Sequence, residues 1–471
     1  MGITLAQAGI SHLFGFEGTL AESIFIAGFS GLVVAALLLM RLSLRHWLLA
    51  GILFATALTA PLNPTSTGYL PTWLLPVQLN RASIHLALGL LLLLTCIGSI
   101  PGRWLSTQAV LLVVIPLYAA LLRFYHDDLR TGVESVGLAM GALPAMVLVI
   151  PRICGTLEGC WTTVRTTMWA SIIWIFCCSV QFVINPVLLV NTQGRFWGMA
   201  ANAQQAAIMC STLAMIALGL LLFDPKRRAR PLWIGVLAIN LLFVMWTASR
   251  TGALTTAVGL GVLLVGRGSR GLILIPGAAV LFLVLLALAN ALGIQDNLDR
   301  FTGGEDTRTA AWTQQIQTGL SNPLFGVGLG TTFTENSYLN GFASYGVFML
   351  VLLLIFTYVS FTLCRRIYRD RAWLTQEERG LMYITFAWHA MYFAAAFFEG
   401  FMVARSSHQQ IMMFMFAGVA LYLRNRIQDE QLAHAEGYGT HADDAYDAGE
   451  PDPYSAPDPD HPDHPNPATH T

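Results

Sequence analysis

The chain has 471 residues, of which 55% are hydrophobic and 11% are charged, and its mean hydropathy is +0.59. Soluble domains average about 25% charged residues, so this composition excludes a soluble globule, a secreted disulfide scaffold and a nucleic-acid-binding protein. Apolar segments recur at close to the roughly 20 residues that a helix needs to cross a bilayer. The sequence therefore predicts an all-α polytopic membrane protein that lies in a lipid bilayer.

In chain order, the sequence predicts a weakly amphipathic lead-in over residues 1–22 and then a transmembrane domain over residues 23–427. About 12–13 transmembrane helices fit this domain, because that many apolar runs approach spanning length. The runs lie near 23–40, 46–62, 83–100, 106–122, 132–150, 166–186, 203–223, 231–248, 251–266, 271–292, 340–363, 380–398 and 409–423. Several runs are short for a bilayer, so a merger of two runs or one re-entrant segment stays open.

The basic residues orient these helices, because cytoplasmic loops carry an excess of Lys and Arg. Alternate connections hold 18 of the 26 basic residues, and this alternation continues along the whole chain. It predicts an outer N-terminus, a long outer loop over residues 293–339 and a cytoplasmic C-terminus. The remaining basic residues fall on the outer side: Arg81, Arg123, Arg130, Arg195, Arg250, Arg300, Arg308 and Arg405.

The last segment, residues 428–471, differs from the rest in composition. Eleven acidic residues follow Arg426 and no basic residue does, while prolines are frequent. Such a segment lacks the apolar surface that offsets the entropy of ordering, so we predict a disordered cytoplasmic tail. Its histidines could capture a metal, but a solvated tail is favoured. The seven cysteines form no CxxC pattern, and we predict neither a disulfide framework nor a metal site.

The outer arginines need an explanation, because the orientation signal does not require them. An arginine near membrane depth is costly and usually pairs with an anion or faces a wet cavity. Its planar fork of donors matches a phosphate group in two places at once. We predict that Arg195, Arg250 and Arg308 form an anion site, and Arg300 and Arg405 fit either interpretation. Contact with lipid headgroups or with local acids is favoured for three others, Arg81, Arg123 and Arg130.

The long outer loop contains further candidate residues. Residues 307–322 predict a helix, because Trp312, Ile316 and Leu320 repeat every four residues on one face. The glycines that follow, Gly326, Gly328 and Gly330, permit a tight backbone, although no nucleotide site is implied. Glu335 and Asn336 come next, at the membrane edge. They favour either a helix N-terminus or a place in the site.

The order of these residues resembles the O-antigen ligase/polymerase superfamily, over roughly residues 190–420. The matching motifs are Arg195-x-x-Gly198, Ser249-Arg250-Thr251-Gly252, Arg308-x-x-x-Trp312, Pro323-x-x-Gly326-x-Gly328 and Asn336-Ser337-Tyr338-Leu339 with Gly346. The resemblance implies a GT-C-like glycosyltransferase of the bacterial inner (cytoplasmic) membrane, with its active face in the periplasm. It also implies a glycan donor linked to undecaprenyl diphosphate, with no cofactor and no metal.

The resemblance further implies roles for individual residues. Arg195, Arg250 and Arg308 would bind the departing diphosphate, where negative charge develops in the transition state. Ligases of this family typically have a histidine immediately before the Asn of the motif, and here that position is Glu335. Glu335 is therefore the candidate base, with Glu399 as the alternative. Asn336, Arg405 and Glu399 are the further candidates for substrate binding.

The departure at Glu335 favours the polymerase branch. We expect polymerisation of lipid-linked repeat units into O-antigen or exopolysaccharide, with a chain-length regulator and a flippase as candidate partners. A ligase that moves the glycan to an acceptor such as lipid A–core is the first alternative, and a polysaccharide-lipid transporter is the second. The sequence shows no internal repeat and gathers its polar residues on one face, which favours an enzyme over a transporter. We also expect a bundle-facing, hydrogen-bonded His389 and a solvated His408.

Overall fold

The computed structural model describes residues 43–58, 81–95, 105–126, 143, 146–184, 189–190, 194–200, 202–226, 229–268, 308–328, 335–402 and 407–435. The predicted lead-in, the predicted helices 23–40 and 271–292, most of 132–150, and Arg300 and Arg405 lie outside these residues. Residues 1–427 and 428–471 form two separate units, and the account below concerns the first.

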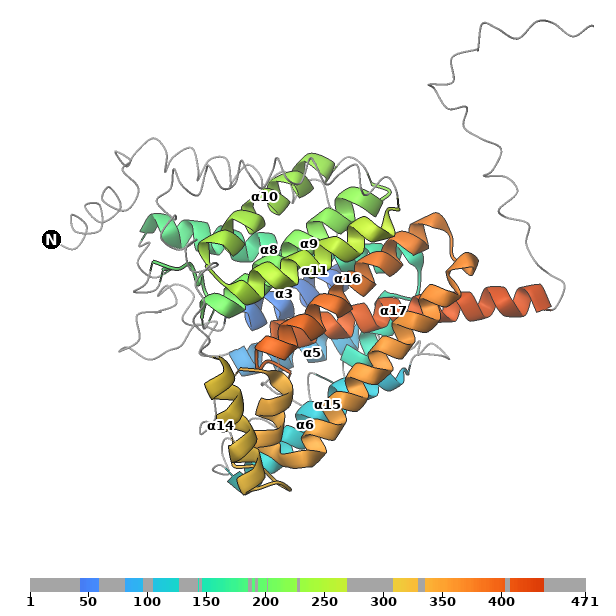
Figure 1. The fold of residues 1–471 in the computed structure, drawn as a ribbon. Coiled ribbons are helices and arrows are strands. Elements are labelled where there is room, and N and C mark those ends of the chain that lie inside the picture. Colours follow the sequence, from blue (N-terminus) through green and yellow to red (C-terminus); the bar gives the residue numbers. More distant parts are fainter. Residues whose placement is uncertain are drawn as a thin grey trace, which may run out of the picture. The chain divides into compact units, whose positions relative to one another are not determined.

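The described residues are almost entirely helical (Figure 1). The helices are α3 (Leu44–Ala57), α5 (Arg81–Leu94), α6 (Thr107–His126), α8 (Leu157–Ile184), α9 (Ala203–Phe223), α10 (Arg230–Trp246), α11 (Arg250–Gly266), α14 (Arg308–Ser321), α15 (Ser337–Arg369), the 3-10 helix η3 (Arg371–Trp373), α16 (Gln376–Phe398) and α17 (His408–Ala435). An isolated bridge between Val190 and Phe196 is the β-type pairing among these residues. This confirms the all-α class. Residues 428–435, which we predict to begin the tail, continue helix α17.

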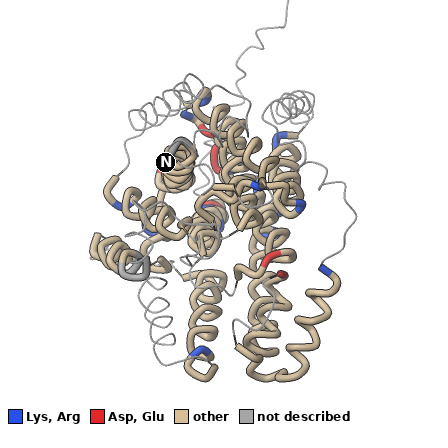
Figure 2. The backbone as a smooth tube through the Cα atoms, turned by 90° about the vertical axis from the view of Figure 1, so that its left-hand side faces the viewer, with Lys and Arg blue, Asp and Glu red and all other residues tan. Residues whose placement is uncertain are grey.

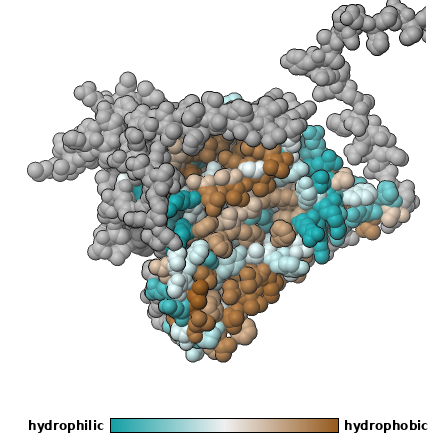
Figure 3. Space-filling view, in the orientation of Figure 1, coloured by the Kyte–Doolittle hydropathy of each residue, from teal (hydrophilic) through white to brown (hydrophobic). Residues whose placement is uncertain are grey.

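Six described helices are long and apolar enough to cross a membrane, namely α6, α8, α9, α10, α15 and α16. Helices α3 and α11 are apolar but shorter. Only 22% of the apolar window of α15 is buried, and Figure 3 shows a broad hydrophobic surface over this part of the molecule. The protein is therefore a polytopic membrane protein in which α15 presents side chains such as Tyr358 and Phe361 to lipid.

The core is built around α9, which packs against α10, α11 and α16, while α16 also packs against α11 (Figure 1). Small residues allow these helices to approach closely, as they commonly do in membrane bundles. A Cβ atom at Gly252 would lie 2.5 Å from Ala207 Cβ, and one at Gly259 would lie 2.2 Å from Met391 Sδ. The end of α11 that carries Arg250 is thereby held firmly against α9.

Two buried histidines find hydrogen-bond partners inside the bundle. His389 is buried, its Nδ1 donates to Thr385 O at 2.8 Å, and its Nε2 accepts from Gln108 Nε2 at 2.8 Å. This confirms the bundle-facing, hydrogen-bonded prediction for His389. The prediction of a solvated His408 is wrong, because this residue begins α17, is buried, and donates from Nδ1 to Leu53 O at 3.1 Å.

The burial of Arg123 bears on one of the two alternatives for this residue, contact with lipid headgroups, while pairing with a local acid stays a prediction. Its side chain is 4% exposed, and its Nε donates to Tyr345 Oη at 3.3 Å. The alternative in which Arg123 extends to lipid headgroups is therefore wrong. The physical reason is that the last turn of α6 packs against α15, so the guanidinium finds a hydroxyl partner within the protein.

Helix α15 is broken at Gly346, where φ is +80° and ψ is −175°. The segment after α14 fits into this break. Three backbone hydrogen bonds join this segment to α15. Val347 N donates to Pro323 O at 2.8 Å, Val327 N to Ala343 O at 2.9 Å and Gly328 N to Ser344 O at 3.0 Å. Gly326 and Gly328 have positive φ, so these two glycines allow residues 323–328 to pack against α15.

We predict that Gly346→Ala destabilises the protein by about 3 kcal/mol, because φ and ψ here are accessible essentially to glycine alone. An added Cβ would also lie 2.0 Å from Leu324 O. The matched control is Gly261→Ala in α11, where a Cβ meets nothing within 4 Å. Thermal unfolding in detergent should show a lower Tm for Gly346→Ala and no decrease for Gly261→Ala. Equal Tm values for the two variants would contradict the assignment.

Candidate active site

The site is built on the turn between α10 and α11, residues 247–251. Helix α10 ends at Trp246, and Ala248 then takes a positive φ of 48°, which turns the chain sharply. Ser249 caps α11, since its Oγ accepts from Gly252 N at 3.2 Å. Arg250 is therefore the first residue of α11, and its side chain is exposed. The turn places a cation at the positive end of a helix dipole, which is a favourable location for an anion.

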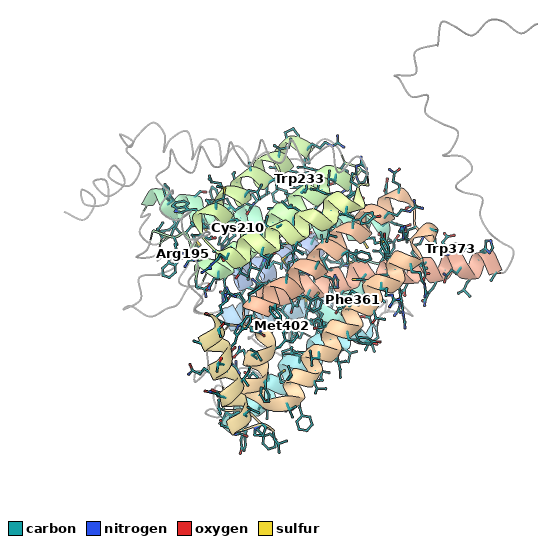
Figure 4. All side chains as sticks on the ribbon, in the orientation of Figure 1. Arg195, Cys210, Trp233, Phe361, Trp373 and Met402 are labelled. Carbon is teal, nitrogen blue, oxygen red and sulfur yellow. The ribbon has the colours of Figure 1, made fainter. Side chains whose placement is uncertain are left out.

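Arg195 reaches the same turn from the loop before α9 (Figure 4). Its Nε donates to Thr247 O at 2.7 Å. The neighbours of Arg195 are tied to the end of α10 as well, because Phe196 N donates to Trp246 O at 3.2 Å and Trp246 Nε1 donates to Gly194 O at 3.1 Å. The position of Arg195 relative to the turn is therefore fixed by three hydrogen bonds.

Arg308 approaches the turn from α14, of which it is the first residue. Its Nη2 donates to Thr251 Oγ1 at 2.7 Å, and its Nη1 donates to Phe398 O at 3.2 Å. The guanidinium also lies over the Phe398 ring, 4.8 Å from the ring centroid. Arg308 thus joins α11, α14 and the end of α16. Figure 2 shows that charged residues lie mainly at helix ends, as these do.

A carboxyl group faces this arginine. Glu399 follows the last residue of α16 and is 6% exposed. Its Oε1 lies 3.9 Å from Arg308 Nη2 and has no hydrogen-bond partner among the described residues. Burial raises the pKa of Glu399 to about 8; nearby Arg308 and Arg195 act in the opposite direction and Glu335 adds to the increase. The electrostatic influence of Glu335 and Arg195 on Glu399 indicates that these groups share one region.

The N-terminus of α15 completes the site. Asn336 has a positive φ of 62° and caps the helix, because its Oδ1 accepts from Tyr338 N at 3.0 Å and from Leu339 N at 3.2 Å. Glu335 precedes it, and its Oε2 is buried without a hydrogen-bond partner among the described residues. This geometry supports the helix N-terminus interpretation of Asn336, while its substrate-binding role stays a prediction.

Ser337 connects α15 to the loop that carries Glu399. Its Oγ donates to Glu399 O at 2.5 Å and accepts from Met402 N at 3.2 Å. The backbone of Glu399 is therefore fixed to the same helix end that positions Glu335. The sequence analysis missed two contact residues of the site, Ser337 and Thr251. Both lie inside the motifs, but the motifs alone indicate no role for either.

Helix α14 confirms the helix predicted over residues 307–322, but the face that carries its large apolar residues is not its most buried face. Trp312 packs against Phe397 and Phe398, with ring centroids 5.5 and 6.5 Å away. Ile316 and Leu320 are exposed, by 42% and 65%. The buried face is made of small and polar residues, Ala311, Gln315 and Gly319. The reason is the close approach of α15, where a Cβ at Gly319 would lie 2.3 Å from the Phe342 ring.

The structure thus gathers most of the predicted site residues. Arg195 and Arg308 contact the α10–α11 turn, Arg250 lies within it, and Glu399 and Glu335 lie close by. Arg405 lies outside the described residues. The arrangement presents cations and helix N-termini beside two carboxyl groups, which suits the binding of an anionic group next to a proton acceptor.

One comparison with known proteins bears on this site. Residues 235–354 match the model of a family described as O-antigen ligase. The matched segment contains Arg250, Arg308 and Glu335, whereas Arg195 and Glu399 lie outside it. A comparison with curated proteins gave no match to this chain.

The raised pKa of Glu399 predicts how stability depends on pH. Because the folded protein holds this proton more tightly than the unfolded chain, stability should fall as pH rises from about 4.5 to about 8. Replacing Glu399 by Gln removes this contribution. We expect the variant to match the parent near pH 4.5, where both folded forms are neutral at this position, and to have a Tm a few degrees higher at pH 9.

The matched control is Glu377→Gln, at an exposed position in the first turn of α16. It should leave the pH dependence of Tm unchanged. Melting curves in detergent between about pH 4.5 and 9 measure all three proteins. The same slope in the parent and in Glu399→Gln would show that Glu399 does not titrate in this range.

Proposed function

On the basis of the O-antigen ligase domain at residues 235–354, we propose that the chain is a membrane glycosyltransferase with a lipid-diphosphate-linked donor. In this proposal it polymerises undecaprenyl-diphosphate-linked repeat units into O-antigen or exopolysaccharide. It acts at the periplasmic face of the bacterial inner membrane, with the C-terminal tail in the cytoplasm. A flippase would supply its substrate, and a chain-length regulator would act with it.

The observation that carries this proposal is the meeting of Arg195, Arg250 and Arg308 at residues 247–251. A diphosphate is the anion that best fits several guanidinium groups, since each can hold phosphate oxygens at two points. Two helices also begin at these arginines, α11 at Arg250 and α14 at Arg308. Their N-termini add partial positive charge where the leaving group would gain negative charge.

The proposed reaction is a displacement at the anomeric carbon. A hydroxyl oxygen of the acceptor glycan forms a bond to this carbon, and the bond between the carbon and the diphosphate oxygen breaks. The lipid diphosphate leaves with the electron pair, stabilised by the arginines. The hydroxyl proton passes to a carboxylate. The activated leaving group is already present in the substrate, so the chain's residues need only orient the partners and manage charge.

Glu335 is the proposed proton acceptor, because its Oε2 is buried with no hydrogen-bond partner in the part of the chain that the structure describes. It also lies at the end of α15 that is bonded to the backbone of Glu399. Glu399 is the alternative. Its pKa of about 8 is close to neutral pH, which suits a general base, but burial keeps it largely protonated there. In this proposal Glu399 is a binding-site residue that lies beside Arg308, with its Oε1 atom 3.9 Å from Arg308 Nη2.

The ligase is a second candidate, favoured by the match of residues 235–354 to a family described as O-antigen ligase. Both reactions use the same donor site and differ in the acceptor, which is a second lipid-linked glycan for the polymerase and lipid A–core for the ligase. Glu335 in place of the usual histidine favours the polymerase. A transporter is the third alternative, and it would not require a proton acceptor beside the anion site.

We predict that purified protein converts single lipid-linked repeat units into a ladder of longer glycans on electrophoresis. Arg308→Ala and Arg250→Ala should each lower the rate by about 100-fold or more, because each removes a charged donor from the leaving group. The matched control is Arg369→Ala, at an exposed arginine that pairs with neighbouring Asp370 at 2.8 Å. This variant should retain the parent rate.

Each other outcome selects another function. Transfer that begins only when lipid A–core is added indicates the ligase. If folded protein gives no transfer with either acceptor, the proposal is wrong, and uptake of lipid-linked units into vesicles then tests the transporter. A parent-like rate in Arg308→Ala would remove this arginine from the reaction.

A further inference from the structure

We propose that Thr251 is a positioning residue that orients the guanidinium of Arg308 toward the leaving group. This inference rests on the proposed function, because it assigns Thr251 to the diphosphate site. Thr251 Oγ1 accepts from Arg308 Nη2 at 2.7 Å, across a sequence separation of 57 residues. The sequence motifs include Thr251, but they give it no task.

The position of Arg308 depends on such contacts, because it is the first residue of its helix. Its guanidinium is held by Thr251 Oγ1 and by Phe398 O, and its face lies against the Phe398 ring. The carbonyl and the ring belong to the end of α16, whereas the hydroxyl belongs to α11. Thr251 therefore decides where the guanidinium lies relative to Arg250, which is on the same helix.

Thr251 is itself well fixed. It is 3% exposed and lies in the first turn of α11, two residues after the N-cap residue Ser249. The next residue, Gly252, packs against Ala207 of α9, and its carbonyl oxygen accepts from Ser211 Oγ at 2.9 Å. A β-branched side chain also has few rotamers in a helix, so the acceptor atom is held in place.

The chemical nature of the acceptor matters for the reaction. A hydroxyl orients the guanidinium without cancelling its charge. A carboxylate at the same distance would neutralise it, and the Oε1 atom of Glu399 is farther away, at 3.9 Å. Its raised pKa further weakens its hold on Arg308 at neutral pH. A neutral acceptor at Thr251 thus supports preorganised transition-state stabilisation.

The test uses Thr251→Val, which keeps the shape and removes the acceptor. We expect kcat to fall by about 10- to 100-fold, as misplacement of a charged group does, with a change in KM of less than about threefold. Thr251→Ser restores the hydroxyl and should recover kcat to within about threefold. The matched control is Thr255→Val, since Thr255 is buried one turn later and its hydroxyl donates within α11, to Thr251 O at 2.9 Å and Gly252 O at 3.0 Å. It should retain the parent kcat.

A parent-like kcat in Thr251→Val would overturn the inference, and so would a Thr251→Ser variant as slow as Thr251→Val, since packing would then explain the loss. If Thr251→Val does not fold, Thr251→Ala is measured against Thr251→Ser in the same way. Binding of inorganic pyrophosphate to the detergent-solubilised full chain separates this inference from the proposed function. If no acceptor is glycosylated, pyrophosphate affinity that weakens in Thr251→Val and returns in Thr251→Ser still supports the positioning role, and unchanged affinity overturns it.

Discussion

The site depends on the hydrogen bonds by which two neutral oxygen atoms hold the guanidinium of Arg308. Arg308 donates to a threonine hydroxyl and to a backbone carbonyl, and these come from two different helices. Both contacts require α11 and the end of α16 to lie close together, and Gly259 of α11, which faces Met391 of α16, makes this approach feasible. The electrostatic character of the site is therefore a product of helix packing as much as of charged residues.

The N-terminal part of α15 shows a related dependence of the site on backbone geometry. Gly346 breaks the helix, and residues 323–328 bond to the residues around the break. This arrangement fixes the segment after α14 against α15, and α14 packs along α15. Helix α14 begins at Arg308, and α15 begins directly after Glu335 and Asn336. A glycine remote from Arg308 and Glu335 thus helps to hold together the two helices whose N-terminal ends carry these residues.

The sequence predicted much of this arrangement, and the limits of that prediction have physical causes. The bounds of the helix at 203–223 were correct, because a polar residue lies at each end of the apolar run, Asn202 as the N-cap and Asp224 as the C-cap. The shared outer placement of Arg195, Arg250 and Arg308 predicted one anion site, and contacts to one turn join them. The break at Gly346 was missed, because it lies inside an apolar run that reads as one helix. His408 was misjudged, because its partner Leu53 O is 355 residues away. Sequence spacing carries no information about such a contact.

The contact between Arg195 and Thr247 O has a consequence for how the chain is divided. The family match begins at residue 235 and ends at 354, so it omits both Arg195 and Glu399. The site is therefore a composite of segments that are distant in the chain, and the matched stretch is no autonomous module. Exchanging that stretch between related chains would move Arg250, Arg308 and Thr251 together but would leave Arg195, Phe398 and Glu399 behind. The site proposed here therefore requires helices from outside the matched stretch as well as those within it.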